Sequence, residues 1–126
     1  MKEVVITKEN FENEVLNEKD LPIKYAGYSP CFRKEAGAAG RDTRGIVRIH
    51  QFNKVEQYIY CTPEQSDEMH EHLLNNLCEI MEDLELPYRV IMACTGDMGF
   101  NKVKMNDVEA WFPSEGAYRE LGSCSS

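Results

Sequence analysis

The sequence predicts an α+β domain in which antiparallel strands are flanked by a helix. Two aromatic-rich extended runs, one strongly periodic helical segment and a further set of strand-like runs follow one another along the chain. The 126 residues, 42% of them hydrophobic, suffice for one domain with a core. We expect a hairpin over 23–60, a helix over 63–85 and strands over 88–125, all within one domain, 1–126.

The first predicted element is a hairpin with a long loop. Residues 23–35 form an extended, aromatic-rich run, and Pro30 within it is typical of an edge strand or a bulge. Residues 36–45 combine three glycines with small alanines, which is loop composition. Residues 46–60 then resume as a strand rich in β-branched and aromatic side chains. The loop is longer than a hairpin needs, which favours a functional role for it.

A helix is predicted next, with a clear start signal. Thr62 suits the N-cap, Pro63 the first helical position, and Gln65 completes a capping box. Apolar residues at steps of three and four predict one buried stripe: Met69, Leu73, Leu77, Ile80 and Leu84. The remaining face is acidic and is expected to face solvent.

Strand-like runs end the chain. Residues 88–94 read as a buried strand, and the runs 107–112 and 117–125 are separated by four turn-forming residues. That spacing predicts that the last two strands pair antiparallel.

Charge and composition exclude several classes of function. The net charge of −8 argues against binding nucleic acid through bulk charge. No apolar run reaches the roughly 18 residues of a membrane span, so we expect no membrane partner and a cytoplasmic protein. Five cysteines without a C-x-x-C pair disfavour a disulfide framework or a zinc site.

Basic residues are concentrated in the predicted hairpin. Four of the six arginines fall there: Arg33, Arg41, Arg44 and Arg48. Guanidinium groups match phosphate oxygens, so this cluster points to a small phosphate-bearing ligand. Strand alternation places Arg33 and Glu35 on one face. On the returning strand it gives a common face to Arg48, His50, Phe52, Lys54 and Glu56. A salt-bridged, solvent-facing sheet is the alternative reading of the same pattern.

Two carboxylates in the last strands, Glu109 and Glu120, form a further candidate site. As a pair they suit Mg²⁺, although isolated surface carboxylates are the alternative.

Several motifs in order resemble seryl-tRNA synthetases, which are class II aminoacyl-tRNA synthetases. Residues 29–57 contain Phe-Arg-x-Glu, Gly-Arg-Asp-Thr-Arg-Gly and His-Gln-Phe-x-Lys-Val-Glu, the pattern of motif 2 in that family. The agreement continues at 86–89, 95–99, 107–113 and 118–125, and so covers nearly the whole chain. The resemblance implies a ligase that makes seryl-adenylate from serine and ATP with Mg²⁺, and then esterifies tRNA(Ser).

The resemblance also assigns residues. It implies catalytic roles for Arg33, Glu35 and Arg48, with Arg33 on the α-phosphate and Phe52 stacked on adenine. The implied ATP-binding residues are Arg33, Lys34, Glu35, Arg48, Ile49, Phe52, Glu120, Leu121, Gly122 and Ser123. The implied serine-binding residues are Glu56 and Glu3, and Glu120 is the implied Mg²⁺ ligand.

The sequence departs from the family in extent. Family members are several times longer, carry a coiled-coil arm for tRNA and form homodimers through motif 1, while motifs 1 and 3 are absent here. The sequence therefore looks like an internal piece around motif 2, and we expect weak or no activity from it alone. Gly122 stands where many members have serine or another residue. Two alternatives stay open: a non-catalytic nucleotide-binding or interaction module, and an amino-acid ligase paralogue.

Overall fold

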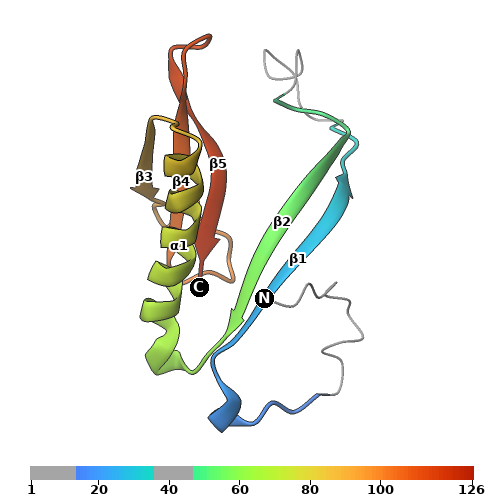
Figure 1. Cartoon of the computed structure of the whole chain (residues 1–126), viewed down its shortest axis with the longest axis vertical. Helices are drawn as coiled ribbons and strands as arrows, with labels where there is room; N and C mark the ends of the chain where they lie inside the picture. Colours follow the sequence, from blue (N-terminus) through green and yellow to red (C-terminus); the bar gives the residue numbers. More distant parts are fainter. Residues whose placement is uncertain (1–13, 36–46) are drawn as a thin grey trace. The chain divides into compact units, whose positions relative to one another are not determined.

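The computed structural model describes residues 14–35 and 47–126. The chain divides into two compact units, Met1–Tyr60 and Cys61–Ser126. Within the described residues the first unit holds a two-stranded antiparallel sheet, and the second holds a three-stranded antiparallel sheet with one α-helix (Figure 1). These elements confirm the predicted α+β class. No helix in the described part is long and apolar enough to cross a membrane.

The first sheet is the hairpin that the sequence predicts. Strand β1 (Ile23–Phe32) pairs with β2 (Gln51–Tyr60) in one unbroken register, and the short 3₁₀ helix η2 (Glu18–Asp20) precedes it. The register continues past β1, because the Arg33 N–H donates to the His50 carbonyl at 2.9 Å. Hydrogen-bonded and non-hydrogen-bonded pairs alternate along an antiparallel ladder, so Pro30 falls at a non-hydrogen-bonded position. Its missing N–H therefore costs no ladder bond, and no bulge forms there.

The strands of this hairpin are shorter than the sequence predicts. The run expected to extend through residue 35 ends at Phe32, and the strand expected over 46–60 begins at Gln51. Glu35 has φ 51°, a left-handed conformation that strand alternation cannot include. The loop 36–45, with Arg41 and Arg44, lies outside the described residues.

The helix of the second unit begins with a 3₁₀ turn. Helix η4 (Pro63–Gln65) leads directly into α1 (Ser66–Asp83), so the predicted span of 63–85 divides into two kinds of helix. The Gln65 side chain accepts a hydrogen bond from the Thr62 N–H at 3.0 Å, which is one half of the expected capping box. Glu85, at φ 54°, ends the segment in a left-handed conformation that suits a helix C-terminus.

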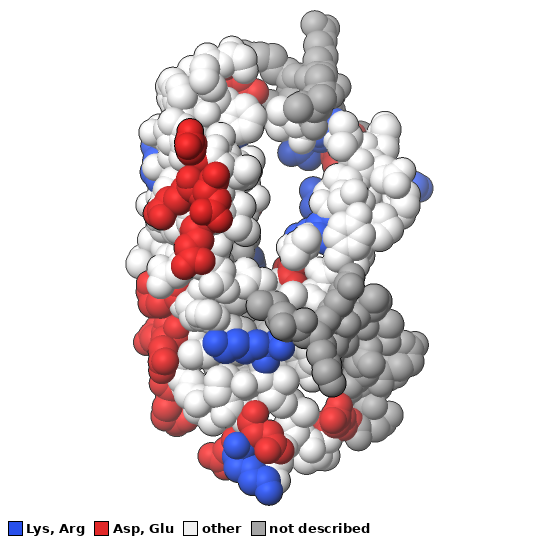
Figure 2. Space-filling view, in the orientation of Figure 1, with Lys and Arg blue, Asp and Glu red and all other residues white. Residues whose placement is uncertain are grey.

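The buried face of α1 is rotated from the predicted stripe. The side chains that are buried or packed on the core are Met69, His70, Leu73, Leu74, Leu77, Cys78 and Met81. Ile80 and Leu84, which the stripe includes, are 48% and 61% exposed. Apolar residues cover about half of the circumference of α1, so periodicity alone does not select the contact face. Figure 2 shows acidic side chains gathered along this helix.

The second sheet has the order β3–β4–β5, all antiparallel. Its strands are β3 (Tyr88–Met92), β4 (Met105–Phe112) and β5 (Ala117–Ser125). The turn between the last two contains Gly116 at φ 64°, as the predicted hairpin requires. The core is centred on Val108, which is fully buried.

Gly122 explains how closely α1 approaches this sheet. A Cβ atom at that position would lie 2.8 Å from Cδ2 of Leu77, which is shorter than side chains tolerate. Gly122 is directly opposite Val108 in the register, so it belongs to the face that the helix covers. The glycine that departs from the family pattern therefore has a packing role in this chain.

Candidate functional site

The loop end of the first hairpin, where β1 ends and β2 begins, carries two arginines that each contact another side chain. The guanidinium of Arg33 lies over the ring of Phe52, with its carbon 5.1 Å from the ring centroid. Arg48 Nη1 contacts Glu35 Oε2 at 2.9 Å. His50 Nδ1 lies 3.1 Å from the Arg33 carbonyl oxygen, and because a carbonyl only accepts, this nitrogen carries the proton. The end of the ladder therefore fixes the backbone from which Arg33 projects.

Strand alternation, from which the sequence predicts a common face for these residues, explains only some of the contacts. Alternation holds within β2, where Phe52, Lys54 and Glu56 share one face. It does not account for Glu35 and Arg48, because both lie beyond the strand ends. The structure brings that pair together through chain reversal and an ion pair instead.

Glu56 lies on the same face as Phe52, four residues further along β2. Lys54 Nζ contacts Glu56 Oε2 at 2.7 Å. Its hydrogen bond to Glu56 raises the pKa of Lys54, against the opposing effect of desolvation. Directly across the ladder from Glu56 is Gly27, which contributes no side chain.

A β-bulge in β5 produces a second cluster of polar residues. Val108 pairs with Gly122, but Glu109 pairs with Glu120, so Leu121 is an extra residue without a partner in the register. Directly opposed residues share a face, and the bulge therefore turns Glu120 to the same side as Glu109. That side is opposite to the one covered by α1.

The sheet face opposite α1 carries Asp107, Glu109 and Glu120 and is called the carboxylate face; an arginine neutralises Glu109. Arg89 Nε contacts Glu109 Oε2 at 2.6 Å, and the same guanidinium lies 4.3 Å from the ring centroid of Tyr118. Tyr118 in turn makes an edge contact with Trp111, at 5.2 Å between ring centroids. The Glu109 carboxylate is thus paired with an arginine, although Glu120 lies directly opposite it in the register.

Asp107 and Glu120 form no ion pair within the part of the chain that the structure describes. Desolvation raises the pKa of Asp107, and the carboxylates of Asp97 and Glu109 raise it further, whereas Lys102 opposes them. Desolvation likewise raises the pKa of Glu120, and the nearby carboxylate of Asp107 raises it further.

Asp107 is the more buried of these two carboxylates. It is 8% exposed, and its Oδ1 atom has no hydrogen-bond partner among the described residues. An uncompensated carboxylate of this kind suits a cation. Three or more His, Cys, Asp or Glu side chains are nowhere gathered as metal ligands in the described ranges. Any Mg²⁺ here would take its other ligands from water and phosphate oxygens, which is its usual coordination.

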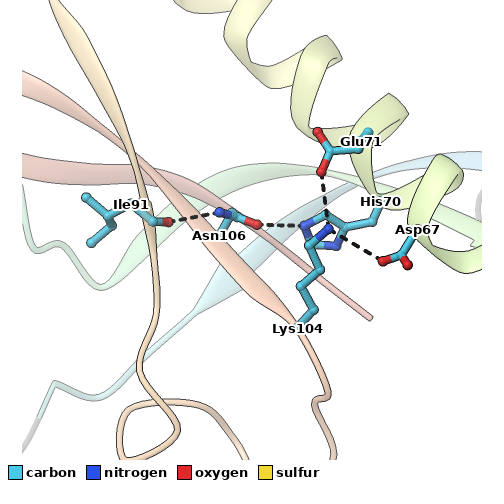
Figure 3. A network of polar contacts seen from close by, with 6 residues as sticks. All are labelled: Asp67, His70, Glu71, Ile91, Lys104 and Asn106. Carbon is cyan, nitrogen blue, oxygen red and sulfur yellow. Dashed lines mark hydrogen bonds and ion pairs between the residues drawn. The ribbon is translucent and has the colours of Figure 1, made fainter.

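A buried polar network joins the helix to the second sheet (Figure 3). His70 Nε2 contacts Asn106 Oδ1 at 2.9 Å, and Asn106 Nδ2 donates to the Ile91 carbonyl at 3.2 Å. Since the amide oxygen accepts, Nε2 of the imidazole carries the proton. Nearby, Lys104, the residue that precedes β4, forms ion pairs with Glu71 and Asp67 of α1, at 3.2 and 3.5 Å. These contacts fix α1 on the sheet that carries the carboxylate face.

The other predicted site residues lie in varied settings. Lys34 and Ile49 are exposed near the loop end of the hairpin. Ser123 is opposite Asp107, Leu121 is the bulge residue, and Gly122 faces α1. Glu3 lies outside the described residues.

Sequence reasoning missed Arg89 and Asp107 as members of the site. A signal for Arg89 existed, because a strand arginine was followed by strands rich in carboxylates. No sequence signal announced the bulge on which the grouping of Asp107 with Glu120 depends.

The whole chain matches one family model, and relatives match it closely. Residues 1–126 match the tRNA synthetase class II core domain (G, H, P, S and T). The chain is 57% identical over 113 residues to a serine–tRNA ligase of Archaeoglobus fulgidus, and 53% identical over 116 residues to one of Bdellovibrio bacteriovorus. These alignments cover 90% and 92% of this chain, but 25% and 27% of the relatives. The chain thus spans about a quarter of the length of the curated relatives it matches.

Solved structures show the same likeness. Seryl-tRNA synthetase from Pyrococcus horikoshii, complexed with ATP, matches with a TM-score of 0.84 and 56% identity over 90% of this chain and 25% of that one. Cytoplasmic serine–tRNA ligase from Naegleria fowleri, in complex with AMP, matches with a TM-score of 0.79 and 47% identity, over 86% of this chain and 26% of that one.

Proposed function

The chain belongs to the class II core-domain family of tRNA synthetases, and from that premise we propose that it forms part of the catalytic domain of a cytoplasmic serine–tRNA ligase. The observation that carries the proposal is the set of side chains between the loop end of the β1–β2 hairpin and Glu56. There, a guanidinium beside an aromatic ring, a second arginine paired with a glutamate and a further carboxylate occur within one element. Such a set suits a nucleotide and an amino acid, which present phosphates, a flat base and an ammonium group.

The proposed reaction is the activation of serine by ATP. The serine carboxylate attacks the α-phosphorus and pyrophosphate leaves. A hydroxyl group of tRNA(Ser) then attacks the carbonyl carbon of the adenylate, which forms the ester and releases AMP. Arg33 neutralises charge on the α-phosphate as the new bond forms, and Glu35 and Arg48 support it. Phe52 offers a ring on which adenine stacks, and Glu56, with Glu3, receives the serine ammonium or hydroxyl group. No covalent intermediate with the protein is required, because alignment and charge neutralisation suffice.

We propose five further nucleotide-binding residues from the motifs of the family. They are Lys34, Ile49, Leu121, Gly122 and Ser123. Glu120 would hold Mg²⁺, and the unpartnered Oδ1 of Asp107 on the same face is consistent with a cation there. A bound Mg²⁺ would neutralise phosphate charge. We further propose that residues 1–126 are part of one catalytic domain, which in the intact enzyme works as a homodimer.

Serine-dependent exchange of pyrophosphate into ATP tests the proposal. In the intact enzyme, with which all of these variants are measured, we expect exchange that Arg33→Ala lowers by about 10²–10³-fold, which is the usual effect of removing one group that stabilises developing charge. Lys24→Ala is the matched control, because it removes a cation from the opposite face of the same hairpin. Undiminished exchange in Arg33→Ala would contradict the assigned role. Calorimetry gives a second reading: ATP binding without exchange would favour a non-catalytic nucleotide-binding module, and neither binding nor exchange would refute the proposal.

A further inference from the structure

Glu56, which the proposed function takes as a serine-binding residue, forms an ion pair with Lys54. The two side chains are two residues apart on β2 and therefore lie on one face, with Nζ and Oε2 separated by 2.7 Å. Within β1 and β2 the only lysines are Lys24 and Lys54, and the sequence places no arginine in either strand. Lys24 pairs with Ile59 and so lies on the other face, which leaves Lys54 as the strand cation next to Glu56.

The Glu56 side chain is partly exposed on this face. Gly27 is opposite Glu56 and offers no packing partner, and the Glu56 side chain is 40% exposed. A glutamate in that setting samples several rotamers, and a ligand that binds it must first order it. A lysine on one carboxylate oxygen orders the group in advance. The carboxylate has two oxygens with about four acceptor positions, so a second ammonium group can bind beside the first.

We propose that Lys54 is a positioning residue, which holds the Glu56 carboxylate in the orientation that receives the α-ammonium group of the amino acid. The inference rests on the proposed function, because it takes Glu56 as the ammonium-binding residue. Lys54 itself does not touch the reacting atoms. Its effect is therefore confined to ligands that carry an ammonium group.

Two stable analogues isolate that effect without depending on turnover. The first is a seryl-adenylate analogue in which a sulfamoyl group replaces the phosphate, and the second is the same molecule without its amino group. Calorimetric affinities for both are measured with the unaltered protein, Lys54→Met, Lys54→Arg and Glu56→Gln. Lys24→Met is the matched control, since it removes the other lysine of the hairpin from the opposite face.

We expect Lys54→Met to weaken binding of the amino-bearing analogue by about three- to tenfold, the usual cost of ordering one flexible side chain. Binding of the deaminated analogue stays unchanged, Lys54→Arg restores most of the affinity, and Lys24→Met has no effect. Equal weakening for both analogues, or none for either, overturns the positioning role while a selective loss in Glu56→Gln leaves the proposed function standing. If Glu56→Gln shows no selectivity, or if the unaltered protein binds neither analogue, the proposed function fails as well.

Discussion

Replacing Gly122 by alanine tests how α1 is seated on the second sheet. The added Cβ would lie 2.8 Å from Cδ2 and 3.1 Å from Cδ1 of Leu77, so Leu77 must withdraw by about 0.6 Å to reach the ordinary contact limit of 3.4 Å. Overpacking of this kind costs about 1–3 kcal/mol. Alanine also restricts the unfolded chain more than glycine does, which returns about 0.4–1 kcal/mol. The clash is the larger effect, and we expect a net loss of about 1 kcal/mol of unfolding free energy.

A double-mutant cycle identifies the contact. Leu77→Ala alone loses packing against the core and costs about 2 kcal/mol or more. In the double variant the new methyl group occupies space that Leu77 has left, so the combined loss should be smaller than the sum by about 1 kcal/mol. Urea unfolding followed by circular dichroism measures all four free energies. Strict additivity, or a Gly122→Ala variant that is as stable as the unaltered chain, would refute the close approach of helix and sheet.

Three further predictions concern polar groups of the second unit. Because the folded state raises the pKa of Asp107, this group stabilises the folded state below its unfolded pKa, and that contribution is lost as the pH rises through the folded pKa. Asp107→Asn should therefore raise the melting temperature at pH 7, but not at about pH 3. Asn106→Ala leaves the buried Nε2 of His70 without its acceptor and should cost about 1–3 kcal/mol, as measured by thermal unfolding, whereas an unchanged stability would contradict the buried hydrogen bond. The hydrogen bond from Tyr88 to Glu82 raises the pKa of the phenol to about 12, so its contribution to stability is lost only as the pH rises through that value; ultraviolet titration should show the pKa fall toward 10 in Glu82→Gln.

Local sequence signals predicted much of the fold. The start of the helical segment at Thr62, the turn before Ala117 and the antiparallel pairing of the last two strands follow from short-range chemistry, and each is confirmed. The face of α1 was not predictable in the same way. Ile80 and Leu84 have the correct spacing, but the contact face depends on where the sheet offers room, as it does above Gly122.

The candidate site was predictable mainly through its motifs. The comparisons confirm the resemblance to seryl-tRNA synthetases that those motifs indicated. Strand alternation correctly grouped Phe52 with Glu56, since both lie within β2. It cannot explain the pairing of Glu35 with Arg48, which lies beyond the strand ends and depends on a left-handed residue at the end of the extended run. Individual roles for these residues remain predictions.

The face on which Glu120 lies is determined by the extra residue in β5 rather than by the chemistry of the glutamate side chain. On the C-terminal side of Leu121 the strand is phased by Gly122 and Cys124, which meet the helix-covered core. On the N-terminal side the phase is the opposite one, so Glu120 and Tyr118 project to the open face. Deleting Leu121 would not change any other side chain, yet it would exchange the two faces of residues 117–120. Insertions and deletions in this strand therefore matter more for the candidate site than most substitutions do.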